Sequence, residues 1–168
     1  MTGAARGIGA AIGKALAAEG AAVAINYASS KQQAEQVVRA IEDRKGNAIA
    51  VKADISNRAE AAELFGRVKQ AYGRLDVLVN NAAFFEFRPL DSIDEQHFRK
   101  QFDVNVLGLL FATQEAVKLM LSGGSVVNIS SVRRSRRSLQ GPCIARQKPR
   151  LTFSPVRWLK NWDRGRFG

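Results

Sequence analysis

Three glycines near the start of the chain constrain its fold more than any other feature. They are Gly3, Gly7 and Gly9, and they lie in the segment Thr-Gly-Ala-Ala-Arg-Gly-Ile-Gly, which spans residues 2–9. From Gly7 onward apolar residues recur at the spacing of one helix face, which predicts a glycine-rich turn that opens a helix. Such a turn suits a phosphate, because glycine lets the backbone approach closely and a helix N-terminus offers free N–H groups. The alternative is a helix after a flexible loop, since short glycine patterns are weak evidence alone.

The end of the next expected strand indicates which nucleotide would bind. Residues 21–27 are mostly apolar, as in a buried parallel strand. In an NAD-binding βαβ unit an acidic residue near the end of this strand holds the ribose 2′-hydroxyl. This chain has no carboxylate there, and it carries a cation, Arg6, in the glycine turn. The strand ends instead in neutral residues: Asn26, Tyr27, Ala28 and Ser29. A cation with neutral donors fits a 2′-phosphate, which favours NADP over NAD.

Length and composition exclude several classes of protein. The 168 residues fit one domain with its own core. No apolar run reaches the ~20 residues of a membrane span and no signal peptide opens the chain, so we expect a cytoplasmic protein. Cys143 is the only cysteine, which argues against a disulfide framework and a cysteine metal site, and we expect no bound metal. We expect His97, the only histidine, to be exposed on a polar helix, which argues against histidine-based catalysis.

The net charge of +11 belongs to one end of the chain. Residues 1–131 carry 15 basic and 14 acidic residues, a net charge of +1. Residues 132–168 carry 11 basic residues and one acid, a net charge of +10. This distribution argues against a nucleic-acid-binding surface on the body of the protein. Because residues 132–168 show no sustained periodicity, we expect them to be disordered or non-native.

Expected strands and helices alternate along residues 1–131. We expect strands at residues 21–27, 47–53, 75–81 and 125–130. We expect helices at 7–19 and 30–44, from a cap at Asn57 (with Glu60 at the capping-box position) to Gly73, from a cap at Ser92 with Glu95, and, largely buried, from Val106 to Met120, ended by Gly123-Gly124. This alternation predicts an α/β fold, a Rossmann-type doubly wound parallel sheet.

Five motifs follow one another in the order of a known family. They are residues 2–9, Asp54-Ile55, Asn80-Asn81-Ala82-Ala83, Asn105-Val106 and Asn128-Ile129-Ser130-Ser131. Together they resemble the short-chain dehydrogenase/reductase family, and most closely its 3-oxoacyl-[acyl-carrier-protein] reductase-like and glucose-dehydrogenase-like members. The resemblance implies hydride transfer between NADP(H) and a small-molecule carbonyl or alcohol, and homo-oligomers among intact members. It also implies an incomplete sheet, truncated at the N-terminus, because the first strand of the family precedes the Thr-Gly turn and its last strands follow Ser131.

The resemblance assigns cofactor contacts to three of these motifs. The pyrophosphate and 2′-phosphate would contact Gly3, Arg6, Gly7, Ile8 and Gly9. Asp54 and Ile55 would flank the adenine, and Asn81 and Ala82 would line the ribose on the nicotinamide side. The family usually has glycine at Ala83, where the backbone approaches the cofactor, so the extra methyl group should lower the affinity. Asn81 also has a structural interpretation, as a buried amide that satisfies backbone groups.

The catalytic residues that the resemblance implies are only partly present. Asn105 would support an active-site water, unless it has only a structural role, and Ser131 would hydrogen-bond the substrate carbonyl. The family protonates the product oxygen with a Tyr-x-x-x-Lys pair about a dozen residues later, since general acid work needs a tuned group within reach. This chain has no tyrosine after Tyr72, and Ile144 lies four residues before Lys148. We therefore expect the chain to be catalytically impaired.

A shift of the reading frame would explain the missing pair. Read from the last base of the first codon, Cys143–Ile144 encodes Tyr or His, and Gln147–Lys148 encodes Lys or Glu four codons later. We therefore predict that the chain is translated out of frame from about Val132, so that a partial NAD(P)-binding domain spans residues 1–131. The alternative is a non-enzymic nucleotide-binding fragment whose genuine arginine-rich tail binds nucleic acid.

Overall fold

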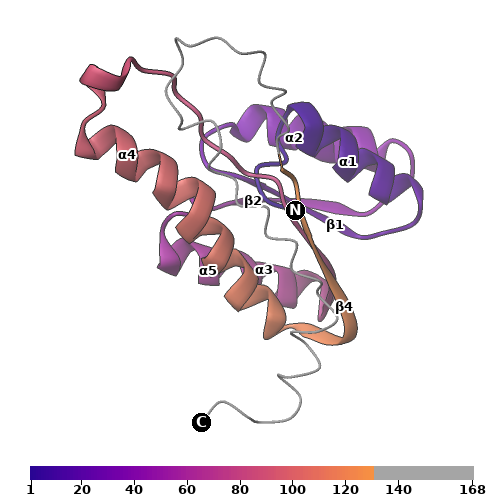
Figure 1. Cartoon of the computed structure of the whole chain (residues 1–168). Coiled ribbons are helices and arrows are strands. Elements are labelled where there is room, and N and C mark those ends of the chain that lie inside the picture. The colour runs from indigo at the N-terminus through magenta and orange to yellow at the C-terminus, as the bar shows by residue number, and fades with distance from the viewer. Residues whose placement is uncertain (131–168) are drawn as a thin grey trace, which may run out of the picture.

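The structure, a computed structural model, describes residues 1–130 (Figure 1). Ser131 and the basic segment 132–168 lie outside the described residues. The described elements follow one another as α1 (Gly7–Ala18), β1 (Val23–Tyr27), α2 (Lys31–Glu42), β2 (Ala48–Lys52), α3 (Arg58–Tyr72), β3 (Leu75–Asn80), the 3-10 turn η1 (Leu90–Ser92), α4 (Glu95–Phe102), the π-helical turn η2 (Asp103–Leu107), α5 (Gly108–Val117) and β4 (Met120–Asn128). The predicted alternation of strands and helices is therefore confirmed.

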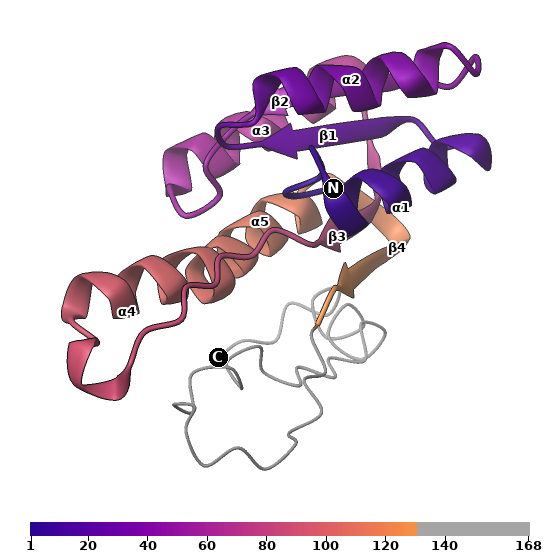
Figure 2. The same ribbon diagram turned by 90° about the horizontal axis from the view of Figure 1, so that it is seen from above.

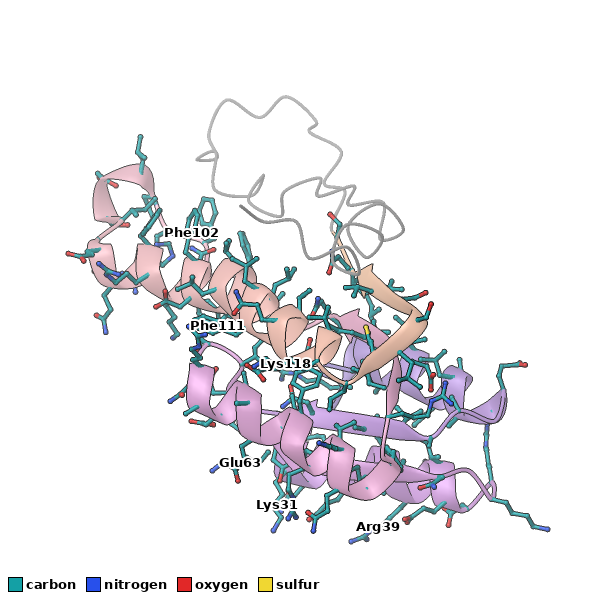
Figure 3. The ribbon with its side chains drawn as sticks, turned by 90° about the horizontal axis from the view of Figure 1, so that it is seen from below. Lys31, Arg39, Glu63, Phe102, Phe111 and Lys118 are labelled. Atoms are coloured by element: carbon teal, nitrogen blue, oxygen red, sulfur yellow. The ribbon has the colours of Figure 1, made fainter. Side chains whose placement is uncertain are left out.

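The strands form two parallel pairs between two layers of helices. β1 pairs with β2, and β3 pairs with β4. Helices α1 and α2 cover one face, while α3 and α5 pack on the other (Figure 1). The exposed side chains of Lys31, Arg39 and Glu63 project away from the strands, as expected for the outer faces of α2 and α3 (Figure 3). Among the described helices, none has the length and apolar character that crossing a bilayer requires.

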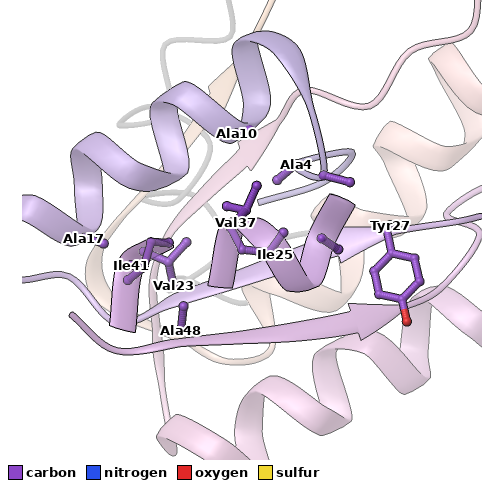
Figure 4. Packing of buried hydrophobic residues seen from close by; sticks show 11 residues of the cluster. Ala4, Ala10, Ala17, Val23, Ile25, Tyr27, Val37, Ile41 and Ala48 are labelled. Atoms are coloured by element: carbon purple, nitrogen blue, oxygen red, sulfur yellow. The ribbon is translucent and has the colours of Figure 1, made fainter. Parts of the chain in front are cut away.

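Two core clusters hold these layers together. The first lies between α1, α2 and β1, where Ile25 and Ile41 are almost wholly buried among small alanines (Figure 4). The second lies between α3, α5 and the strands, around Phe65 and Leu78. Each fully buried aliphatic or aromatic side chain contributes on the order of 1.5–3 kcal/mol, so these clusters account for most of the favourable energy of the fold.

Met1 and Thr2 bridge the two strand pairs. The Met1 ammonium donates to Ala24 O (2.9 Å), and the backbone amide of Asn26 donates to Met1 O (3.1 Å). On the other side the Thr2 amide donates to Val79 O (3.0 Å). β1 and β3 do not pair with each other, so these two residues occupy a strand position between them. The predicted Rossmann-type sheet is thus present in part, with two residues at its centre.

The buried amino group of Met1 makes the stability of the 168-residue chain depend on pH. Burial lowers the pKa of this group from 8.0 to about 6. Below pH ~6 the Met1 amino group is protonated in both the folded and the unfolded chain. Between pH ~6 and ~8 it is protonated only in the unfolded chain. Stability should therefore rise by roughly 3 kcal/mol as the pH rises from 6 to 8. The far-UV circular dichroism signal that the chain retains at one fixed urea concentration follows this rise, which an N-terminally acetylated chain should lack. An equal rise after acetylation contradicts the assignment.

The ends of α3 follow the predicted capping pattern with one difference. Asn57 Oδ1 accepts from the amides of Ala59 (2.9 Å) and Glu60 (3.3 Å), so the predicted N-cap is confirmed. Gly73 ends the helix in a left-handed conformation (φ 74°). The Glu60 carboxylate does not close a capping box on the backbone amide of Asn57, because that amide donates to Asp54 O. The Glu60 carboxylate accepts instead from the backbone amide of Asp54 (2.8 Å). The second half of the box therefore braces the end of β2.

The predicted cap of α4 was wrong. Ser92 lies in η1, where its hydroxyl donates to Pro89 O (2.9 Å). Asp94 is the N-cap, and its carboxylate accepts from the His97 amide (2.6 Å). This bond, together with the nearby Arg88, lowers the pKa of Asp94. A carboxylate is a stronger acceptor than a hydroxyl, so the residue two positions later caps the helix.

The predicted end of the long helix was also wrong. α5 ends at Val117, and Met120 already pairs with Leu75 in β4. The glycines at 123 and 124 lie inside the strand, where Gly123 (φ 93°) accompanies an irregularity in the register with β3. A glycine pair in this place marks a bulge and does not stop a helix. The helix is also less buried than expected, since Leu110 is exposed.

Candidate cofactor site

Glycine is required twice where the first turn crosses the segment after β3. Gly3 has φ +59°, and a Cβ atom on it would lie 2.7 Å from the Cα of Ala82. A Cβ atom on Gly9 would lie 2.6 Å from Asn81 Nδ2. Real Cβ atoms do not approach other atoms this closely, so any larger residue would separate the two segments. The structure thus brings together two predicted motifs that lie about 80 residues apart.

Thr2 and Asn81 fasten this crossing. The amides of Asn81 and Ala82 both donate to Thr2 Oγ1 (3.1 Å each). The Asn81 side chain donates to Thr2 O (3.1 Å) and Gly3 O (2.8 Å). Both amide hydrogens of the half-buried Asn81 side chain therefore satisfy backbone carbonyls of the turn, the bonds that its structural interpretation predicted. Ala83 follows on the exposed side of this crossing.

The N-terminus of α1 is open beside the crossing. Its N-cap residue Arg6 makes no capping hydrogen bond, and the first turn contains no acidic residue. Within the described residues, the amides of Gly7 and Ile8 have no acceptor. Arg6, Gly7 and Ile8 are all exposed, and the Ile8 side chain is 65% accessible. Free amides, the positive end of a helix dipole and a nearby guanidinium form a chemical environment that suits a phosphate.

The four predicted residues at the end of β1 divide into two buried and two exposed ones. Asn26 is 2% exposed and all its side-chain partners are backbone atoms. Tyr27 packs in the first core cluster (Figure 4). Ala28 and Ser29 are exposed at the same edge as the glycine turn. Of this group, only Ala28 and Ser29 offer their surfaces to a ligand.

Asp54 and Ile55 point in different directions after β2. Asp54 is exposed, and its carboxylate accepts from the amide (2.9 Å) and hydroxyl (2.7 Å) of Ser56. Ile55 is buried in the second cluster, where a Cβ atom on Gly108 would lie 2.9 Å from its Cδ1. A pocket of about 690 Å³ lies beside Asp54 and is lined on its other side by α4 and η2. The exposed carboxylate, and not the apolar side chain, therefore faces the open space.

Asn105 lies in the π-helical turn η2 and holds the loop after β3. Its Oδ1 accepts from the Phe84 amide (2.9 Å), and its Nδ2 donates to Phe84 O (2.8 Å). Helix α4, the turn η2 and helix α5 form one continuous rod, which runs alongside the segment that follows β3 (Figure 2). π-helical turns inside α-helices are frequent at functional sites, which agrees with the predicted importance of Asn105. Ser131, the other predicted catalytic residue, lies outside the described residues.

His97 and Gln101 were missed by the sequence predictions. The expectation that His97 is exposed was wrong, because its ring is 2% exposed and its Nε2 lies 3.0 Å from Glu86 O. Gln101, also 2% exposed, approaches the same carbonyl (3.4 Å). With Asn105 they recur every four residues along one helix face, and all three contact the backbone of the loop at 84–86. That spacing is the signal that could have found them.

Comparisons with known proteins agree with this geometry. A family model described as short chain dehydrogenase matches residues 1–143. An uncharacterised oxidoreductase of Methylorubrum extorquens is 56% identical over 132 residues, which are 79% of this chain and 53% of that protein. The chain spans about half the length of the curated relatives it matches.

Two solved structures with a similar fold contain a nucleotide. A short chain dehydrogenase from Burkholderia cenocepacia in complex with NADP has a TM-score of 0.83 at 36% identity, over 97% of this chain and 65% of that one. A blue fluorescent protein from a metagenomic library, in complex with NADPH, has a TM-score of 0.74 at 37% identity, over 77% and 53% of the two chains. These likenesses extend to the order and arrangement of the strands and helices described above.

Proposed function

Because this chain belongs to the short chain dehydrogenase family, we propose that residues 1–131 are a partial NADP(H)-binding domain. The observation that carries this proposal is the open N-terminus of α1 beside the crossing of Gly3 and Ala82. A phosphate bound there would meet free amides and no competing carboxylate. The complete protein would transfer hydride between NADP(H) and the carbonyl or alcohol group of a small molecule.

We further propose that the cofactor is NADP and not NAD. Arg6, Ala28 and Ser29 are the exposed residues at the edge where the ribose of the adenosine half would lie. None of them is acidic, so nothing there repels a 2′-phosphate. The nucleotides in the two similar solved structures, NADP and NADPH, support this choice. Asp54 would lie beside the adenine, and the backbone of Asn81–Ala83 beside the nicotinamide ribose.

Replacing Arg6 tests the choice of cofactor. Arg6→Ala should weaken NADPH binding roughly tenfold, because a hydrogen bond to a charged group contributes about 1.5–3 kcal/mol. NADH binding should change less than twofold, since NADH lacks the 2′-phosphate. Arg39→Ala is the matched control, an exposed arginine on the outer face of α2 (Figure 3). Isothermal titration calorimetry measures the six affinities of the wild type and the two variants for the two nucleotides, and an equal loss for both nucleotides in Arg6→Ala would contradict the proposed contact.

The subgroup, the catalytic residues and the tail are also proposals. We assign the chain to the 3-oxoacyl-[acyl-carrier-protein] reductase-like and glucose-dehydrogenase-like members on its motifs. Asn105 would orient a water and Ser131 the substrate carbonyl, while intact relatives would assemble as homo-oligomers. We place the boundary at residue 131 and attribute residues 132–168 to a shifted frame.

A further inference from the structure

We propose that Asn26 is a positioning residue that fixes the glycine turn and the end of β2 to each other without touching the cofactor. This inference rests on the proposed cofactor site and specifies how that site is held in shape. It assigns to Asn26 a different role from Ala28 and Ser29, which follow it on the surface.

The side chain of Asn26 has no donor left for a ligand. Its Oδ1 accepts from the Gly3 amide (3.2 Å). Its Nδ2 donates to Val51 O (3.3 Å) and Ala53 O (2.9 Å), which uses both amide hydrogens. The residue is 2% exposed. A ribose phosphate therefore has neither a donor nor an open path to this side chain.

The three bonds connect separate parts of the candidate site. Gly3 is the residue whose left-handed backbone allows the turn to cross Ala82. Ala53 directly precedes Asp54, the carboxylate beside the pocket. The backbone of Asn26 adds two further bonds, from its amide to Met1 O (3.1 Å) and from the Ala4 amide to its carbonyl (2.9 Å). One residue therefore sets the turn at a fixed height above β1 and β2.

Only an amide side chain performs all of this at once. The turn supplies a donor, the Gly3 amide, whereas the end of β2 supplies two acceptors, the carbonyls of Val51 and Ala53. An aspartate would lose the donors to both carbonyls, and an apolar residue would lose all three hydrogen bonds. Buried polar groups without partners are costly, so the turn and the strand would move apart to reach water.

A positioning role and a direct contact differ in which nucleotides they affect. Asn26→Ala should weaken NADPH and NADH binding about equally, by about tenfold or more, because the two nucleotides share the pyrophosphate and adenine. A direct ligand of the 2′-phosphate would affect NADPH alone, as expected for Arg6. An NADPH-only loss in Asn26→Ala therefore overturns the inference.

Asn80→Ala is the matched control for general damage to the fold. Asn80 is also buried (4% exposed) at the end of a strand, but it belongs to the other strand pair, where its side chain donates to Thr113 Oγ1 in α5 (3.2 Å) and Asn128 Oδ1 in β4 (3.0 Å). It should change both affinities by less than threefold. An equal loss in Asn80→Ala and Asn26→Ala would mean that any buried asparagine matters, which overturns the inference.

Hydrogen exchange of the Gly3 amide tests, without a cofactor, whether the Asn26 side chain holds the turn to β2. We call these three side-chain hydrogen bonds the clamp. In the full 168-residue chain, Asn26→Ala should speed this exchange at least tenfold, whereas Asn80→Ala should leave it within twofold. Equal exchange in the wild type and Asn26→Ala overturns the inference, whatever the nucleotides do. If the wild type binds neither nucleotide but the exchange result holds, the proposed function fails and the clamp stands. If Asn26→Ala does not fold, as judged by loss of its helical circular dichroism signal, Asn26→Thr replaces it, because threonine suits strands. Asn26→Thr should show the same faster exchange of the Gly3 amide and the same loss of binding to both nucleotides.

Discussion

The 168-residue chain should not oxidise NADPH measurably with any ketone or acyl substrate. It has no tyrosine after Tyr72 and therefore lacks the expected general acid, whose loss alone typically costs about 10²–10⁴-fold in rate. The lysine that would lower the pKa of that tyrosine and hold the nicotinamide ribose is missing with it. These losses act on one site and do not simply add, but each is severe. Asn105 remains fixed by Phe84, but its amide side chain cannot supply the missing proton.

Repairing the gene should restore the activity. The repaired version reads in the shifted frame after Ser131 and carries an added first strand; the loss of NADPH absorbance measures its rate. Its matched control keeps the repaired frame but replaces the new tyrosine with phenylalanine, and should stay inactive. Ordinary turnover by the unrepaired chain would show that another proton donor exists. A gene without a tyrosine codon across Cys143–Ile144 would refute the frame shift, and an inactive repaired protein would contradict the proposed chemistry.

The second large effect concerns stability. The 168-residue chain should lack a sharp, cooperative thermal transition, because two residues hold its two strand pairs together. A strand of four or five apolar residues before Met1 should restore such a transition. Three or four newly buried aliphatic side chains contribute on the order of 1.5–3 kcal/mol each, against a typical domain stability of about 5–15 kcal/mol. The new strand would also pair the facing edges of β1 and β3.

An extension of equal length made of glycine and serine is the matched control for this experiment. It could form the same backbone hydrogen bonds but would bury almost no apolar area, so it should raise the midpoint far less. Differential scanning calorimetry of the three chains measures both sharpness and midpoint. A sharp transition in the unextended chain, or an equal gain from both extensions, would contradict the expected role of the central strand.

Local rules predicted the parts of the fold that depend on neighbouring residues. The cap at Asn57 and the stop at Gly73 follow from side-chain oxygens and left-handed glycine, both properties of a few residues. The alternation of strands and helices follows from apolar spacing in the same way. These features needed no knowledge of what lies across the molecule.

The failures have a different origin, because each depends on a partner far along the chain. His97 is buried since Glu86 O lies across from it, and polar spacing alone could not reveal that acceptor. Met120 joins a strand since Leu75 offers an edge, although the local pattern favoured a helix. Asn26 sits at a strand end like a ligand residue, yet three distant backbone groups occupy its side chain. Contacts across the molecule decided these cases.

The crossing of Thr2 and Asn81 fixes when the candidate site can form during synthesis. The two residues are 79 positions apart, so the glycine turn leaves the ribosome long before its partner exists. At about 5–20 residues per second, the turn waits roughly 4–16 seconds for Asn81 to be made. Until then the backbone groups that Asn81 and Val79 later bind can meet only water or other proteins. The glycine turn is therefore translated well before its partner but settles only after it, and a cofactor cannot assist the growing chain at this crossing before β3 has emerged.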